Sequence, residues 1–280
     1  MKTDRKGPLL LLLAAICWSL GGVCIKFIPF AATTIISLRA VLAVLVFAIY
    51  RKSFRVRLSR GNILAALCLS CTTILFVYAN KLTTAAAAIL LQFTAPVFII
   101  LFQFIFYKHK PKLSEILASA FTISGMLLFF GDKLGSGEIL GNILAIASGL
   151  TFAGVFMFNK RADVEPEQSS MLGFYINAIV FLPFVFFDTS INADLLPWSL
   201  IALLGIVQVG LSYLMFSVAI KQTPALLACL ITAVEPVLNP LLVALVTPER
   251  PGRFALAGGV VIVITVVIYN IWMERNNAKE

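Results

Sequence analysis

The sequence contains ten apolar stretches of about 20 residues, and this feature restricts the fold more than any other. A helix needs about 20 apolar residues to cross the hydrocarbon core of a bilayer, because each residue adds ~1.5 Å. The sequence therefore predicts an all-α integral membrane protein with ten transmembrane helices and short connections. The predicted spans lie at roughly 8–27, 31–50, 63–80, 83–106, 114–131, 138–158, 169–187, 197–217, 223–247 and 254–273.

The composition and charge agree with a membrane protein. Only 12% of the residues are charged, whereas a soluble domain carries about 25%. The net charge of +9 does not indicate a nucleic-acid ligand, because the basic residues lie in short clusters between the apolar stretches. Anionic membrane lipids are the expected partners of these clusters, and no nucleic acid is expected.

The distribution of Lys and Arg predicts the orientation. With the N-terminus inside and alternating spans, 16 of the 22 Lys and Arg residues fall on the inside and five on the outside, while Arg39 lies within a span. This bias predicts that both termini face the cytoplasm. Lys26 and Lys81 lie near the outer ends of their spans, where we expect their side chains to reach the headgroups.

The chain also repeats itself at an offset of 140 residues. Several residues of the fourth span and its approach recur in the ninth: Lys81, Thr83 and Pro96-Val97 recur as Lys221, Thr223 and Pro236-Val237. This repeat predicts two halves of five spans each, 1–132 and 133–280. Because five is odd, the second half must enter the membrane with the opposite orientation. Inverted repeats of this kind are characteristic of secondary transporters, whose substrate site lies near the bilayer midplane.

The chain resembles the bacterial EamA-type proteins of the drug/metabolite transporter superfamily over nearly its whole length. The resemblance rests on Cys17-Trp18-Ser19-Leu20-Gly21-Gly22, on Arg39 in the second span, and on Thr94-Ala95-Pro96-Val97 and Val234-Glu235-Pro236-Val237. It implies ten spans in two five-helix halves and a transport role in a bacterial cell membrane, with export favoured over uptake. The family often has a Glu near the end of the fourth helix, where this chain has Tyr107-Lys108-His109.

Two charged residues, Arg39 and Glu235, lie near the centres of spans, where charge is costly and therefore suggests function. Arg39 could pair with a substrate carboxylate or phosphate, or it could satisfy carbonyls or an acid within the bundle; the resemblance favours the structural role. Glu235 could bind a cationic group, carry a coupling proton, or serve as a hydrogen-bonded acid at a helix kink. Its repeat counterpart is Ala95, a difference that a symmetric packing requirement would not produce.

Prolines inside the spans predict interrupted helices. Pro96, Pro236 and Pro240 each lack a backbone N–H and leave the carbonyl four residues earlier without its helical partner. Such breaks are tolerated in a membrane only where neighbouring helices or a cavity satisfy the backbone. The sequence leaves open whether these positions are hinges or static kinks.

Polar and aromatic side chains within the spans complete the candidate substrate site. Amide and aromatic groups would suit an amino acid, a nucleobase or an organic cation, while hydrogen bonding between helices is the alternative interpretation for each residue. The candidate substrate-binding residues are Trp18, Arg39, Tyr78, Gln92, Tyr175, Asn177, Gln208, Tyr213, Glu235 and Asn239.

The sequence thus favours a secondary transporter that moves a small polar metabolite by alternating access, with proton coupling left open. A channel and a membrane-embedded enzyme are the alternatives. An enzyme would need a nucleophile with a base, paired acids or a metal cluster, but the single His, His109, lies in a basic loop and no second acid accompanies Glu235. We expect a small-molecule substrate, no cofactor and no metal, and the sequence is compatible with a homodimer.

Overall fold

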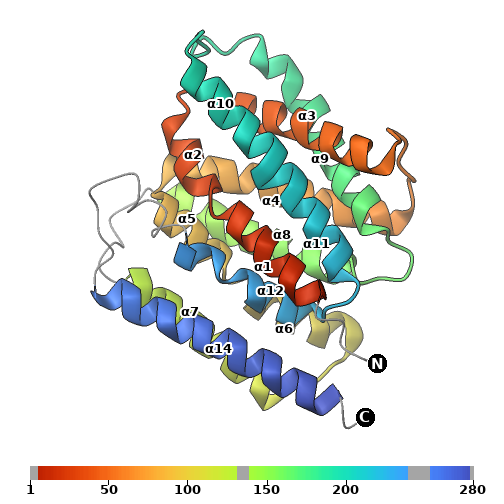
Figure 1. The fold of residues 1–280 in the computed structure, drawn as a ribbon, viewed down its shortest axis with the longest axis vertical. Coiled ribbons are helices and arrows are strands. Elements are labelled where there is room, and N and C mark those ends of the chain that lie inside the picture. Colours follow the sequence, from red (N-terminus) through yellow and green to blue (C-terminus); the bar gives the residue numbers. More distant parts are fainter. Residues whose placement is uncertain (1–5, 131–138, 239–252, 278–280) are drawn as a thin grey trace.

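The computed structural model describes residues 6–130, 139–238 and 253–277, which form helices joined by turns and short loops (Figure 1). The helices before residue 131 are α1 (Lys6–Trp18), α2 (Gly21–Phe27), α3 (Ala32–Arg51), α4 (Arg60–Leu82), α5 (Ala85–Gln92), α6 (Ala95–Tyr107) and α7 (Leu113–Phe130). The later ones are α8 (Ile139–Phe158), α9 (Pro166–Val185), α10 (Leu195–Leu203), the π-helix η1 (Leu204–Leu211), α11 (Ser212–Ile220), α12 (Ala225–Thr232) and α14 (Arg253–Asn277).

Seven of the predicted spans are helices, or runs of consecutive helices, that are long and apolar enough to cross a membrane. They are Lys6–Phe27, Ala32–Arg51, Arg60–Leu82, Ala87–Tyr107, Ile139–Phe158, Pro166–Val185 and Leu195–Ile220. The other three predicted spans coincide with shorter apolar helices at Leu113–Leu128, Ala225–Leu238 and Ala257–Met273. The chain is therefore an all-helical, multi-pass membrane protein in its described parts. The predicted ninth span continues to 247, and its end lies outside these parts.

The main helix contacts join the part of the chain before residue 131 to the part after residue 138. α1 packs against α11 and η1, α4 packs against α8, and α3 packs against α9. α7 and α14 lie side by side along one edge of the bundle (Figure 1). The two parts of the chain are therefore interleaved rather than folded into separate lobes.

Within residues 6–130, 139–238 and 253–277, three of the helical segments are interrupted by two-residue turns. One turn separates α1 from α2, a second separates α5 from α6, and a third follows α12 before the helix resumes at Glu235. Pro96 and Pro236 explain the second and third interruptions, because neither can donate the N–H that would continue the helical ladder. The interruptions predicted at these two prolines are present, while Pro240 lies outside the described residues.

Candidate functional site

A small cavity lies next to all three helix interruptions. Trp18 precedes the first interruption, Gln92 precedes the second and Glu235 follows the third. The other lining residues come from α3, α4, α8, η1 and α11: Arg39, Thr72, Thr73, Phe76, Phe152, Gln208, Val209 and Tyr213. The cavity has a volume of about 30 Å³, which is room for about two water molecules. The cavity in this conformation is therefore too small for a metabolite.

The cavity holds two buried groups of opposite charge type. Arg39 is 3% exposed and Glu235 is 5% exposed. Among the described residues, the ion pairs are Arg57–Glu165, His109–Glu115 and Arg161–Asp163, so Arg39 and Glu235 are not paired with each other. Tyr213 lies within electrostatic range of both. Because unpaired charge is costly in a low-dielectric interior, a ligand that carries both charges would be stabilised here.

Arg39 is held by α4. Its Nη2 donates a hydrogen bond to the carbonyl oxygen of Thr73 at 3.0 Å. The Thr73 side chain also bonds to α9, because Asn177 Nδ2 donates to Thr73 Oγ1 at 2.6 Å. Ser70 completes the chain by donating to Asn177 Oδ1 at 2.5 Å. Asn177 therefore positions the cavity wall and does not itself line the cavity.

The interruption after α5 is covered by α8. Gln92 Nε2 donates to Ser148 Oγ at 2.8 Å, and Ser148 Oγ donates to the carbonyl of Thr72 at 3.1 Å. The next residue, Gly149, is so close that a Cβ atom there would lie 2.6 Å from the carbonyl oxygen of Gln92. A close helix without a side chain thus shields the backbone that Pro96 leaves unbonded, as a break within a membrane requires.

Two polar atoms at the cavity have no protein partner. Within the parts of the chain that the structure describes, Trp18 Nε1 and Gln208 Oε1 are buried and form no hydrogen bond. Gln208 belongs to the π-helix η1, a conformation that often marks functional positions. A buried donor or acceptor without a partner is costly, so these two atoms favour a ligand that offers an acceptor and a donor.

An aromatic wall adjoins the polar groups. The ring centroid of Trp18 lies 4.8 Å from that of Tyr213, 5.8 Å from that of Phe152 and 5.9 Å from that of Phe216. The tilted and edge-on geometries are those that aromatic pairs prefer. Such a wall can pack against an apolar group of a ligand or against a cation.

The structure brings six of the ten predicted residues to the cavity: Trp18, Arg39, Gln92, Gln208, Tyr213 and Glu235. Tyr78 is half-buried and packs against the apolar core, and Asn177 lies behind the cavity wall. Tyr175 lies away from the cavity, where its hydroxyl donates to the carbonyl of Phe54 at 2.9 Å. Asn239 lies outside the described residues.

Sequence reasoning missed five lining residues: Thr72, Thr73, Phe76, Phe152 and Val209. The adjacent Thr72 and Thr73 offered a signal, because two neighbouring hydroxyls in an apolar span require acceptors. The other three are ordinary apolar residues of a membrane helix and gave no signal.

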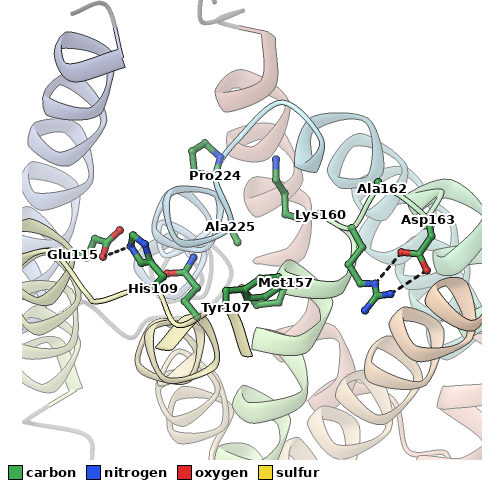
Figure 2. A pocket seen from close by; sticks show the side chains of 11 residues that line it. Tyr107, His109, Glu115, Met157, Lys160, Ala162, Asp163, Pro224 and Ala225 are labelled. Carbon is green, nitrogen blue, oxygen red and sulfur yellow. Dashed lines mark hydrogen bonds and ion pairs between the residues drawn. The ribbon is translucent and has the colours of Figure 1, made fainter. Parts of the chain in front are cut away.

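A larger cavity of about 670 Å³ lies at one end of the bundle (Figure 2). Its lining includes Tyr107, the last residue of α6, His109 in the loop that follows, and Lys160 in the turn after α8. Figure 2 shows two ion pairs at its border, His109 with Glu115 and Arg161 with Asp163. The hydrogen bonds from Arg161 lower the pKa of the Asp163 carboxyl group and keep it ionised. We call this cavity the vestibule.

Known proteins resemble this chain in sequence and in fold. The profile of the EamA-like transporter family matches residues 5–131 and 139–271. Two proteins of Bacillus subtilis (strain 168) are similar over 64% of this chain: "Uncharacterized transporter YwfM" at 27% identity over 62% of its length, and "Uncharacterized transporter YxxF" at 22% over 60%. These matches thus span less than two thirds of either relative.

A solved crystal structure has the same fold, with a TM-score of 0.80 and 18% sequence identity over 97% of this chain and 98% of the other. The chain belongs to the EamA-like transporter family.

Proposed function

We propose that this protein is a secondary transporter that moves a small polar metabolite, such as an amino acid or an organic cation, by alternating access. One observation carries the proposal. Arg39, Glu235, two amide side chains and an aromatic wall meet in one closed cavity beside three interrupted helices. Substrate sites of secondary transporters form where discontinuous helices meet inside the bundle.

The pattern of helix contacts supports two inverted halves, 1–132 and 133–280. In such a repeat α1 corresponds to α8, and α4 corresponds to the segment from α10 to α11. Exchanging the halves therefore converts the contact of α1 with α11 into the contact of α8 with α4, and both contacts exist. The contacts of α3 with α9 and of α7 with α14 convert into themselves. The interruptions after α5 and α12 are also related by the 140-residue offset.

The chemistry of the cavity favours a zwitterion over an ion of one sign. Arg39 would bind a carboxylate, Glu235 would bind an ammonium group, and the rings around Trp18 would pack against the rest of the molecule. Gln92 and Gln208 would supply amide hydrogen bonds. An organic cation would use Glu235 and the aromatic wall and would leave Arg39 in its structural role beside Thr73.

Glu235 is the residue proposed to link transport to protons. It is buried at a helix interruption. Its repeat counterpart Ala95 has no ionisable group, so proton exchange at this position would be confined to the second half. A carboxyl group that alternates between two sides of a membrane can carry a proton when the substrate is absent and release it when a cationic group binds. Export is the proposed direction.

The distribution of basic residues supports the proposed orientation in a bacterial cytoplasmic membrane, with both termini inside. The vestibule would then face the cytoplasm, because Lys160, Arg161 and the basic loop around His109 border it. An opening on that side suits a carrier that collects its substrate from the cell.

The test begins with a thermal-shift screen of the purified protein against amino acids, nucleosides, amines and sugar phosphates. A ligand that binds the folded state raises its stability by mass action, by about 2.7 kcal/mol at 100 times Kd. Ligands that stabilise the protein are then used in vesicles, where saturable counterflow is expected of a carrier. Flux that does not saturate would indicate a channel, and turnover of a lipid would indicate an enzyme.

Glu235→Gln tests the proton link, because glutamine keeps the shape of the side chain and cannot exchange a proton. We expect pH-driven transport to be lost while counterflow of the same ligand persists at a lower apparent affinity, because Glu235 is also proposed to bind the ammonium group. Glu167→Gln is the matched control, since Glu167 lies in the first turn of α9 and not at the cavity. Unchanged pH dependence in Glu235→Gln would remove this residue from the mechanism.

A further inference from the structure

Two lysines at the predicted outer face hold the ends of two parallel helices together. Lys26, in the last turn of α2, donates from Nζ to the carbonyl of Thr83 at 2.7 Å. Lys81, in the last turn of α4, donates from Nζ to the carbonyl of Ile28 at 2.7 Å. Each lysine therefore satisfies the carbonyl that ends the other helix. Both side chains therefore bond to the protein at the end of their spans, and the predicted contact with headgroups stays a prediction for the remaining ammonium donors. We call the pair Lys26 and Lys81 the outer clamp.

A second pair of lysines has the same arrangement at the opposite face. Lys160, just after α8, donates from Nζ to the carbonyl of Lys221 at 2.9 Å. Lys221, just after α11, donates from Nζ to the carbonyl of Arg161 at 2.5 Å. Lys160 thus bonds to the carbonyl that follows the last residue of α11, where a helix end leaves unpaired acceptors, whereas Lys221 bonds to a carbonyl in the turn that follows α8. We call the pair Lys160 and Lys221 the inner clamp.

The two clamps follow the internal repeat. Lys221 is the counterpart of Lys81 at the offset of 140 residues, and α8 corresponds to α1 and α2. The outer clamp joins the first and third spans of the first half, and the inner clamp joins the first and third spans of the second half. Because the halves are inverted, the same contact closes opposite ends of the molecule.

In each clamp, repulsion between the two lysines opposes the attraction of one lysine to a nearby aspartate. Lys26 repels Lys81, and Lys221 repels Lys160, because like charges lie close together in each pair. Burial and this repulsion lower the pKa of Lys160. An aspartate compensates in each case, since Asp188 attracts Lys81 and Asp163 attracts Lys221. A contact whose attraction and repulsion partly cancel can separate more readily than a fully complementary ion pair.

We propose that the outer and inner clamps are the two gates of the transport cycle, and that each opens in turn while the other stays closed. This inference rests on the proposed carrier function and orientation. The spans joined by the outer clamp, α1–α2 and α4, carry Trp18, Thr72, Thr73 and Phe76 to the cavity, so their separation at that end exposes the site to the outside. The spans joined by the inner clamp, α8 and α10–η1–α11, carry Phe152, Gln208, Val209 and Tyr213, and their separation exposes the cavity to the vestibule.

The test measures access to the cavity from each side. The five native cysteines are replaced, and Thr72→Cys introduces a thiol at the cavity. A membrane-impermeant maleimide is added to vesicles of known orientation, right-side-out or inverted. We expect Lys81→Gln to speed labelling from the outside about tenfold, which corresponds to the loss of one charge-assisted hydrogen bond, and to leave labelling from the inside unchanged. Lys160→Gln should have the reverse effect.

Lys81→Arg and Lys160→Arg keep the charge and the donors. In both variants the introduced thiol at position 72 should therefore be labelled at nearly the parental rate. Lys112→Gln, an exposed lysine of the basic loop, is the control for loss of a positive charge. Only variants that elute as a single species with the parental melting behaviour are compared. If the Gln variants change labelling equally from both sides, or lower the melting temperature without changing access, the clamps are structural caps and the proposal is wrong.

The clamp proposal and the carrier proposal can fail separately. If the clamp variants change labelling from one side only but no saturable counterflow is found, the gate proposal stands and the carrier proposal is wrong. If counterflow is saturable but neither Lys81→Gln nor Lys160→Gln changes labelling, the carrier proposal stands and the gate proposal is wrong.

Discussion

Gly149→Ala is the most direct test of how the interrupted helix is held. The new Cβ would lie 2.6 Å from the carbonyl oxygen of Gln92 and 2.8 Å from Thr94 Oγ1. A hydroxyl group can rotate away, but the Gln92 carbonyl is main chain at the turn between α5 and α6 and cannot move alone. Either α8 must shift outward or the turn must change its conformation. Both changes would disturb the hydrogen bond from Gln92 to Ser148, the residue before the substitution.

The expected cost follows from the contact. Overpacking a close helix contact costs about 1–3 kcal/mol, and weakening a buried hydrogen bond adds about 1 kcal/mol. Gly154→Ala is the matched control on the same helix. Its Cβ would meet Cys68 Sγ at 2.7 Å, which is the end of a side chain that can rotate, and the next atom lies at 3.4 Å. We therefore expect a cost below about 1 kcal/mol for this variant.

Thermal unfolding of both variants in the same detergent measures this difference. Gly149→Ala should melt at least several degrees below Gly154→Ala and should also bind any ligand found in the screen more weakly, because Gln92 lines the cavity. Equal melting temperatures would refute the interpretation that α8 supports the interruption. A loss of stability without weaker binding would show that the turn does not position Gln92 for the ligand.

Three further predictions concern individual contacts. Trp18→Phe removes an indole N–H that has no protein partner and shrinks a buried ring, so the melting temperature should fall through lost packing alone while ligand affinity, measured by titration, falls about tenfold if the substrate accepts this bond. Asn177→Ala leaves Ser70 and Thr73 without their shared partner and should cost about 1–3 kcal/mol in unfolding assays. Burial opposes ionisation of Asp188, but hydrogen bonds from Ser190, Thr34 and the backbone at the start of α3 lower the pKa of Asp188 to about 2. Its stabilising effect should therefore be complete above about pH 4 and be lost as the pH falls towards about 2, and Asp188→Asn should remove this pH dependence of the melting temperature.

The helix interruptions illustrate what local chemistry predicts well. A proline lacks its N–H whatever surrounds it, so Pro96 and Pro236 indicated interrupted helices before any packing was known. The interruption between α1 and α2 has no proline, and the sequence did not predict it. It occurs where Gly21 allows close contact with Gln208, since a Cβ there would lie 2.8 Å from Gln208 Nε2. That contact joins residues far apart in the chain.

The candidate site was predicted only in part, and Tyr175 and Gln208 show why. Both are polar or amphipathic residues in apolar helices, and both were equally plausible in sequence. Gln208 reaches the cavity, whereas Tyr175 bonds to the carbonyl of Phe54 in the loop before α4. In a soluble protein an apolar stripe would identify the inward face of a helix. In lipid the outward face is apolar as well, so the pattern does not specify how each helix is rotated.

The sequence alone determined that this chain crosses a membrane several times and that it belongs with the EamA-like transporters, because span length, hydropathy and the repeated motifs are properties of the linear chain. Only the tertiary structure decided that Arg39 and Glu235 share one cavity, that Phe152 lines it, and that lysine side chains bond to carbonyls near the ends of neighbouring helices. These contacts join segments separated by tens to nearly two hundred residues. They depend on how each helix is rotated against its neighbours, which hydropathy does not specify.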